Sequence, residues 1–128
     1  MNEIVLDASV ILAILFHETG LDSLPFDFQD RAILSTVNLA EAQTKLLQRG
    51  FPPDLAWKGT LALAAKTVQF SEDQARIAGD LILQTQSLGL SLGDRSCLAL
   101  AIERNAPVYT TDSAWRDLNL GIPIHVLR

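Results

Sequence analysis

Short apolar runs alternate along the chain with longer segments of helical period. Five runs have the character of buried strands; they cover residues 3–6, 32–37, 68–71, 106–112 and 124–128. Between them, apolar residues recur three and four positions apart, as in amphipathic helices. We expect helices over residues 9–16, 38–50, 52–67, 72–89 and 91–105, and a loop with a helical turn over 17–31. Short strands that alternate with helices predict an α/β fold, with a central parallel sheet covered by helices on both faces.

The chain length and composition favour one globular domain over residues 1–128. The sequence is 48% hydrophobic and 20% charged, which excludes a disordered chain. The single cysteine, Cys97, permits no internal disulfide, and its apolar neighbours at helical spacing predict a small core residue. No apolar run is long enough to cross a bilayer, and the opening segment lacks the basic region of a signal peptide. We therefore expect a cytoplasmic protein.

Four acidic residues follow the predicted strands or open the helices after them. Asp7 directly follows the first strand, and Asp112 follows VYTT at the end of the run over 106–112. Glu41 and Asp94 lie in the first turns of two predicted helices. Because ligands gather beyond the carboxyl ends of the strands in such sheets, the four carboxylates are expected at one edge of the domain.

Each of these acids also has a structural interpretation as a helix cap. Asp7 and Asp112 are placed to cap the segments that follow them, while Asn38 with Glu41 and Ser91 with Asp94 have the spacing of capping boxes. The two interpretations are compatible. Helix N-termini and strand C-termini point the same way in this fold class, so four caps are themselves a cluster of acids.

Clustered carboxylates require protons or a cation, because two like charges about 4 Å apart repel by roughly 4 kcal/mol at an effective dielectric near 20. Oxygen ligands without converging His or Cys suit Mg²⁺ or Mn²⁺ better than Zn²⁺. One or two such ions at a phosphodiester activate a water molecule and stabilise the leaving oxygen. The pattern therefore predicts hydrolysis without a nucleophilic side chain.

The net charge of −5 argues against a broad basic surface for nucleic acid. That objection weakens once the four site acids are set apart, because removing them from the 15 acidic residues leaves 11 against 10 basic ones, a net charge of −1. Candidates for contacts with a phosphate backbone are Arg95, Arg116 and Lys45.

Four motifs in order, VLDASVIL, NLAEAQTKL, LSLGDRSCLALA and VYTTDSAW, resemble a PIN-domain ribonuclease of the VapC toxin kind. The resemblance runs over nearly the whole chain. It implies a three-layer α/β/α fold around a parallel sheet and an endoribonuclease that depends on Mg²⁺ or Mn²⁺. It also implies neutralisation by a cognate antitoxin, and a homodimer that forms higher assemblies with the antitoxin.

The resemblance also assigns roles by position. Asp7, Glu41, Asp94 and Asp112 match the family's four acids, which bind the metal and carry catalysis. The fourth acid varies more among relatives and acts in some through water. Ser9 and Thr111 stand where the family often has a hydroxyl near the acids, and a helix cap and a strand-end turn are equally good interpretations of them.

Several alternatives remain open from the sequence. A response-regulator receiver also uses acids at strand ends, but it needs a late lysine, and none follows Lys66. A haloacid-dehalogenase-type phosphatase has a second Asp two residues after the first, where this chain has Ser9. A PIN-fold nuclease of RNA processing or repair, and a non-catalytic binding module of the same fold, are the alternatives within the fold itself.

Overall fold

The central element is one parallel sheet. The computed structural model describes residues 2–128. Its strands are β1 (Ile4–Leu6), β2 (Ala32–Ser35), β3 (Lys66–Val68), β4 (Val108–Thr110) and β5 (Ile124–Val126). They lie in the order β3-β2-β1-β4-β5, and each neighbouring pair is parallel. The first strand in the chain is therefore central, which places residue 7 in the middle of the carboxyl edge.

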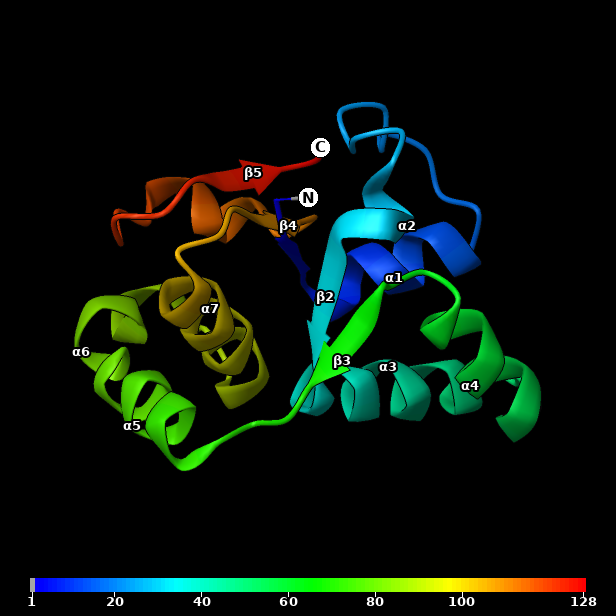
Figure 1. Cartoon of the computed structure of the whole chain (residues 1–128), viewed down its shortest axis with the longest axis horizontal. Coiled ribbons are helices and arrows are strands. Elements are labelled where there is room, and N and C mark those ends of the chain that lie inside the picture. The colour runs from blue at the N-terminus through cyan, green and yellow to red at the C-terminus, as the bar shows by residue number, and fades with distance from the viewer. Residues whose placement is uncertain (1) are drawn as a thin grey trace.

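Helices cover both faces of the sheet, as Figure 1 shows. On one side lie α1 (Ala8–Leu15), α2 (Phe28–Arg31), α3 (Thr36–Gln48) and α4 (Pro53–Leu61). On the other lie α5 (Glu72–Asp80), α6 (Ile82–Thr85) and α7 (Leu92–Arg104). Two short 3₁₀ helices, η1 (Gln86–Leu88) and η2 (Ser113–Asp117), complete the described chain. The expected α/β/α arrangement is confirmed.

Alternate residues of the central strands pack into two different cores. Ile4 and Leu6 of β1 lie in the core on the α1 side, while Val5 lies in the core on the α7 side. All three are fully buried. Burying a side chain of this size contributes roughly 1.5–3 kcal/mol. A strand buried on both faces needs apolar residues at every position, which is why β1 is a continuous apolar run.

Several of the predicted bounds are wrong. The strand expected at 68–71 is β3 at Lys66–Val68, so the helix expected over 52–67 ends earlier, at Leu61. The helix expected from 38 begins at Thr36, because the Ser35 side chain caps it by accepting from the backbone N–H of Val37.

The single long helix expected over 72–89 is broken into α5, α6 and η1. A turn at Leu81 separates α5 from α6, and Leu81 is buried there. The hydroxyl of Thr85, also buried, donates to the Leu81 carbonyl at 2.9 Å. Such back-bonding bends helices. The segment ends at Gly89, whose φ of 68° suits glycine.

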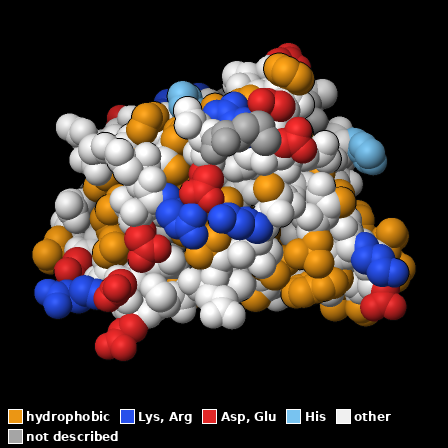
Figure 2. Space-filling view, viewed as in Figure 1, with side chains coloured by type: hydrophobic (Ala, Val, Ile, Leu, Met, Phe, Trp, Pro, Cys, Tyr) orange, Lys and Arg blue, Asp and Glu red, His pale blue; other side chains and the backbone are white. Residues whose placement is uncertain are grey.

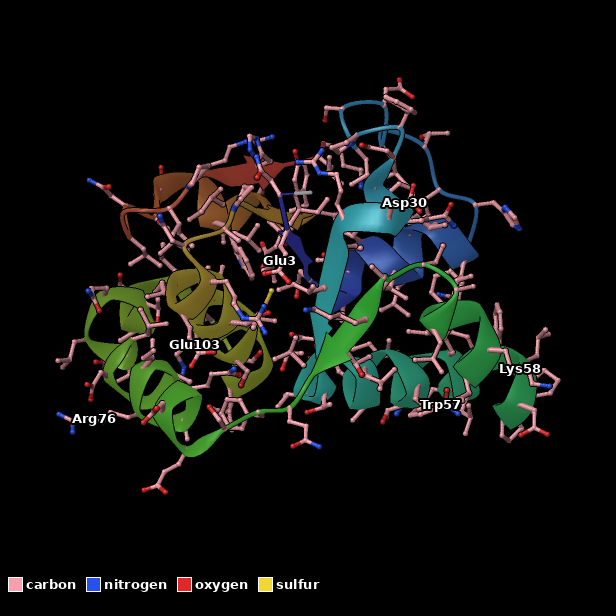
Figure 3. The ribbon with its side chains drawn as sticks, in the orientation of Figure 1. Glu3, Asp30, Trp57, Lys58, Arg76 and Glu103 are labelled. Carbon is pink, nitrogen blue, oxygen red and sulfur yellow. The ribbon has the colours of Figure 1, made fainter. Side chains whose placement is uncertain are left out.

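The amino edge of the sheet carries an ion-pair cluster around Glu3. Glu3 accepts two hydrogen bonds from Arg104 of α7, at 2.8 and 2.9 Å, and pairs with Lys66 of β3 at 3.1 Å. Acidic and basic side chains meet near the centre of the face in Figure 2, and Glu3 is labelled there in Figure 3. Two surface hollows of about 330 and 270 Å³ flank Glu3. None of the four predicted site acids lines either hollow.

Among residues 2–128, no helix combines the length and the apolar character needed to cross a membrane.

Candidate active site

Asp7 lies at the carboxyl end of the central strand and is 4% exposed. Its Oδ2 accepts hydrogen bonds from the hydroxyls of Ser9, at 2.7 Å, and Thr110, at 2.9 Å. These hydroxyls in turn accept from backbone N–H groups, Ser9 from Thr111 at 3.0 Å and Thr110 from Asp112 at 3.1 Å. Asp7 stands at the N-cap position of α1, yet its side chain makes no cap bond. Two short chains of hydrogen bonds therefore converge on one carboxylate oxygen.

The pKa of Asp7 is raised from 3.8 to about 6. Burial is the main cause, and the negative charges of Asp94 and Glu41 raise it further. The bonds from Ser9 and Thr110 act in the opposite direction, since they stabilise the ionised form. The result is a carboxylate that is mostly ionised at neutral pH and that lies in the field of two other acids.

Glu41 is held between α3 and α7. The Nδ2 of Asn38 donates to Glu41 Oε1 at 3.2 Å and to the Gly93 carbonyl at 3.1 Å. Asn38 is fully buried inside α3, so the capping box predicted for Asn38 and Glu41 is wrong. The reason is that Ser35 already caps the helix three residues earlier.

Asp94 opens α7. Its Oδ2 accepts from the backbone N–H of Ser91, while the Ser91 hydroxyl accepts from the backbone N–H of Asp94, and this confirms the predicted capping box. One turn further, Cys97 is fully buried, as expected. Burial and then the charges of Asp7, Asp94 and Glu41 raise the pKa of the Cys97 thiol. The thiol is therefore neutral and lies beneath the acids as a core residue.

Asp112 follows β4 and caps η2, because its Oδ1 accepts from the backbone N–H of Ala114 at 3.0 Å. This is the cap predicted from the sequence. Among residues 2–128, a hydrogen-bond path joins Asp112 to Asp7 through Thr110, whose hydroxyl accepts from the backbone N–H of Asp112 and donates to the Asp7 carboxylate.

The hydroxyl contacts differ in part from the expected ones. Ser9 contacts Asp7 directly, as its position predicted. The second hydroxyl bonded to Asp7 belongs to Thr110, while Thr111 contributes its backbone N–H to Ser9. Side chains of a strand alternate between its two faces, and this alternation is the sequence signal that could have identified Thr110. Thr110 lies four residues after the buried Ala106 and two after the buried Val108, and it is itself fully buried.

The two arginines proposed as backbone contacts make other bonds. Arg95 donates from a terminal nitrogen to the Ala78 carbonyl of α5 at 2.8 Å, and so fastens α5 to α7. Arg116 donates to the backbone carbonyl of Arg128 at 3.0 Å.

The donor set at this edge suits a hard cation, since it offers carboxylate and hydroxyl oxygens and the buried thiol is neutral. Within residues 2–128, no group of three or more His, Cys, Asp or Glu side chains has the geometry of a complete metal site. The bonds to Ser91 and Ala114 each occupy one oxygen of Asp94 and Asp112, which leaves the second oxygen of each to a cation. The residues fit such an ion chemically.

Comparison with solved structures shows the same fold in toxin–antitoxin proteins. The DNA-bound VapBC from Salmonella typhimurium matches with a TM-score of 0.75 and 16% identity, over 100% of both chains. VapBC-5 from Mycobacterium tuberculosis matches with a TM-score of 0.61 and 22% identity, over 100% of this chain and 99% of the other. The M. tuberculosis VapC20, described as a sarcin-ricin loop cleaving toxin, matches with a TM-score of 0.61 and 16% identity, over 94% and 99%.

Among curated proteins, none matches the chain closely enough to count as a relative. The family model described as PIN domain matches residues 4–120. That range includes the four strands β1 to β4 and all four acids at the carboxyl edge. The chain belongs to the PIN domain family.

Proposed function

We propose that this protein is a metal-dependent endoribonuclease that hydrolyses phosphodiester bonds in RNA, and that it is the toxin of a toxin–antitoxin pair. The observation that carries the proposal is the buried Asp7 carboxylate, ionised at the carboxyl edge in the field of Asp94 and Glu41. Membership of the PIN domain family supports it, as does the likeness in fold to a toxin described as cleaving the sarcin-ricin loop.

Asp7, Glu41, Asp94 and Asp112 are the residues that we propose to hold the cation, Mg²⁺ or Mn²⁺. When bound, the cation supplies positive charge at the scissile phosphate and lowers the pKa of a water molecule. Two divalent ions would offset the four carboxylate charges, which removes the electrostatic objection to an RNA substrate.

The chain's own residues fix the acids in place. Ser9 and Thr110 hold Asp7 in one orientation and favour its ionised form, and α7 presents Asp94 from its capped first turn. A carboxylate held in this way loses little side-chain entropy on binding. The buried, neutral thiol of Cys97 excludes a covalent cysteine mechanism at this edge, so water is the proposed nucleophile.

The decisive experiment compares cleavage of single-stranded RNA by the parent protein and by Asp94→Asn, each with Mg²⁺ or Mn²⁺. Asparagine still offers an oxygen to the Ser91 N–H, so the cap of α7 survives while the charge is lost. We expect cleavage to fall by about 100-fold or more, and EDTA to abolish it in the parent.

A matched control is Asp73→Asn, because Asp73 also lies in the first turn of a helix, α5, but is exposed and makes no bond to the site. This variant should cleave like the parent. Equal cleavage by the parent and Asp94→Asn, or no cleavage by the antitoxin-free parent, would contradict the proposal.

A cognate antitoxin is the proposed protein partner, since the fold neighbours include toxin–antitoxin complexes. We further propose that the protein works in the cytoplasm, where its RNA substrate lies. The test is co-expression with the product of a small neighbouring reading frame. Loss of RNA cleavage in the co-purified complex supports the pairing, and full cleavage by that complex contradicts it.

A further inference from the structure

The Asn38 side chain makes hydrogen bonds that the formation of α3 does not require. Its side chain is fully buried in α3, and its Nδ2 bridges Glu41 Oε1 and the Gly93 carbonyl at 3.2 and 3.1 Å. Its Oδ1 is buried without a hydrogen-bond partner within the described chain. A buried, unpaired acceptor destabilises a fold, so a residue that retains one calls for an explanation.

Gly93 completes the arrangement from the opposite helix. A Cβ atom at this position would lie 2.7 Å from Glu41 Oε2 and 3.2 Å from both Oε1 and Cδ. Carbon and oxygen atoms do not approach to 2.7 Å without a bond between them. The φ of Gly93 is not in the left-handed region, so its backbone conformation does not call for glycine. Glycine is called for at position 93 because the Glu41 carboxylate lies so close to where a Cβ atom would stand.

We propose that Asn38 and Gly93 are positioning residues that hold the Glu41 carboxylate against the first turn of α7, next to Asp94. The inference rests on the proposed function, in which both acids bind the cation. Asn38 ties one oxygen of Glu41, and the bare backbone of Gly93 makes room for the other. Because α3 and α7 lie side by side, this contact sets the separation of two acids that come from different faces of the sheet (Figure 1).

Two of the helical glycines, Gly93 and Gly79, provide a matched pair of variants. Gly93→Ala places a methyl group on the Glu41 carboxylate, whereas Gly79→Ala in α5 meets nothing within 4 Å. Alanine favours a helix over glycine at both positions. The Glu41 carboxylate is the end of a flexible side chain, so Gly93→Ala displaces it without disturbing the backbone. Both variants should therefore unfold at the same temperature as the parent or higher.

The readout is Mn²⁺ affinity in the RNA-free protein, measured by calorimetry beside thermal unfolding. We expect Gly93→Ala to raise the Mn²⁺ dissociation constant at least tenfold, Asn38→Ala to raise it as well, and Gly79→Ala to leave it within twofold of the parent. Unchanged Mn²⁺ affinity in Gly93→Ala would overturn the inference. So would a loss of affinity accompanied by a lowered unfolding temperature, because that is the result of a merely structural glycine.

Glu41→Gln separates this inference from the proposed function. If Glu41→Gln binds Mn²⁺ like the parent, Glu41 is not a ligand, and the proposed metal site and the inference are both overturned. If Glu41→Gln weakens Mn²⁺ binding while Gly93→Ala and Asn38→Ala do not, the metal site stands and the positioning role is wrong. Weakened binding in Glu41→Gln, Gly93→Ala and Asn38→Ala, with a retained unfolding temperature in Gly93→Ala, supports both.

Discussion

The ionised carboxylate of Asp7 destabilises the fold that holds it. Its pKa is about 6 in the folded protein against 3.8 in the unfolded chain, because burial and then the neighbouring acids disfavour the charge. Between these two pH values the folded state binds more protons than the unfolded state, so stability falls as the pH rises. Above about pH 6 the whole penalty is present, and it amounts to about 3 kcal/mol.

Replacing Asp7 with Asn removes this penalty and the activity together. In EDTA, we expect the free energy of unfolding of the parent to drop, relative to that of Asp7→Asn, by about 3 kcal/mol between pH 3.5 and pH 7. Urea unfolding at both pH values measures this difference. Parallel pH profiles for the two proteins would contradict the raised pKa. RNA cleavage by Asp7→Asn should be abolished.

Residue spacing predicted which side chains carry charge at this edge but not how each one is held. The cap of Asp94 was predictable because a capping box is local, spanning Ser91 to Asp94. The bonds of Asn38 and Thr110 were not, because they join positions 55 and 103 residues apart. Only the packing of α3 on α7 and of β1 on β4 brings these partners together.

At the scale of elements, α7 packs on α5, on α3 and on the sheet. It packs on α5 through Arg95, which donates to Ala78, and through Glu103, which accepts from the buried Gln74 at 2.8 Å. Figure 3 labels Glu103 on this helix and Arg76 on α5 beyond it. The C-terminal end of α7, at Arg104, is bonded to Glu3 at the amino edge of the sheet. These contacts of Arg95, Glu103 and Arg104 hold α7 in place, and with it the first turn that presents Asp94.

The cluster at Glu3 should stabilise the fold without affecting cleavage. The pKa of Glu3 is lowered, first by its hydrogen bond with Arg104, so its stabilisation is present above pH 4.5 and is lost as the pH falls through the lowered pKa. We expect Glu3→Gln to reduce the free energy of unfolding at pH 7 by about 1 kcal/mol, with a difference that shrinks in acid.

Urea unfolding at pH 7 and pH 3 tests this, with Asp80→Asn as the control. Asp80 pairs with Arg76 on the exposed face of α5, so its loss should change stability by less than about 0.5 kcal/mol. An equal effect of Glu3→Gln at both pH values would contradict the assigned cause. Both variants should cleave RNA like the parent, since both acids lie away from the carboxyl edge.

The central strands β1, β2 and β4 could be predicted from the apolar pattern alone, because every residue in them is buried. The edge strand β3 is partly exposed, and its bounds were predicted wrongly. Helix length was harder to predict. The apolar period continues through Leu81 and Thr85, but the chain turns there so that both side chains reach the core. Periodicity indicates which face of a helix is buried, and it does not indicate where the helix bends.

At the scale of the whole molecule, the described surface, residues 2–128, retains large apolar side chains. Leu47 of α3 and Leu55, Trp57 and Leu61 of α4 are 39–60% exposed, and Figure 2 shows apolar side chains gathered at the lower right of the view. Figure 3 labels Trp57 on the same side of the molecule. Surface of this kind favours association.

We expect the purified protein to be a homodimer, with twice the 14.0 kDa mass of the chain. Light scattering after size exclusion, over a range of protein concentrations, measures the mass directly. A mass of 14.0 kDa at every concentration would show that the protein does not self-associate. One domain over residues 1–128 is likewise a prediction, and a single cooperative unfolding transition is its signature.

The bond between Asp7 and Thr110 has a consequence for protein synthesis. The two residues are 103 positions apart, and β4 must pair with β1 before they meet. While a ribosome is still adding the residues before Thr110, the nascent chain contains Asp7 and Glu41 but has no site that keeps them together. On the proposed function, the RNA-cleaving site is therefore incomplete during most of the chain's own translation. That interval is time in which the proposed antitoxin, if it is made nearby, can bind the chain.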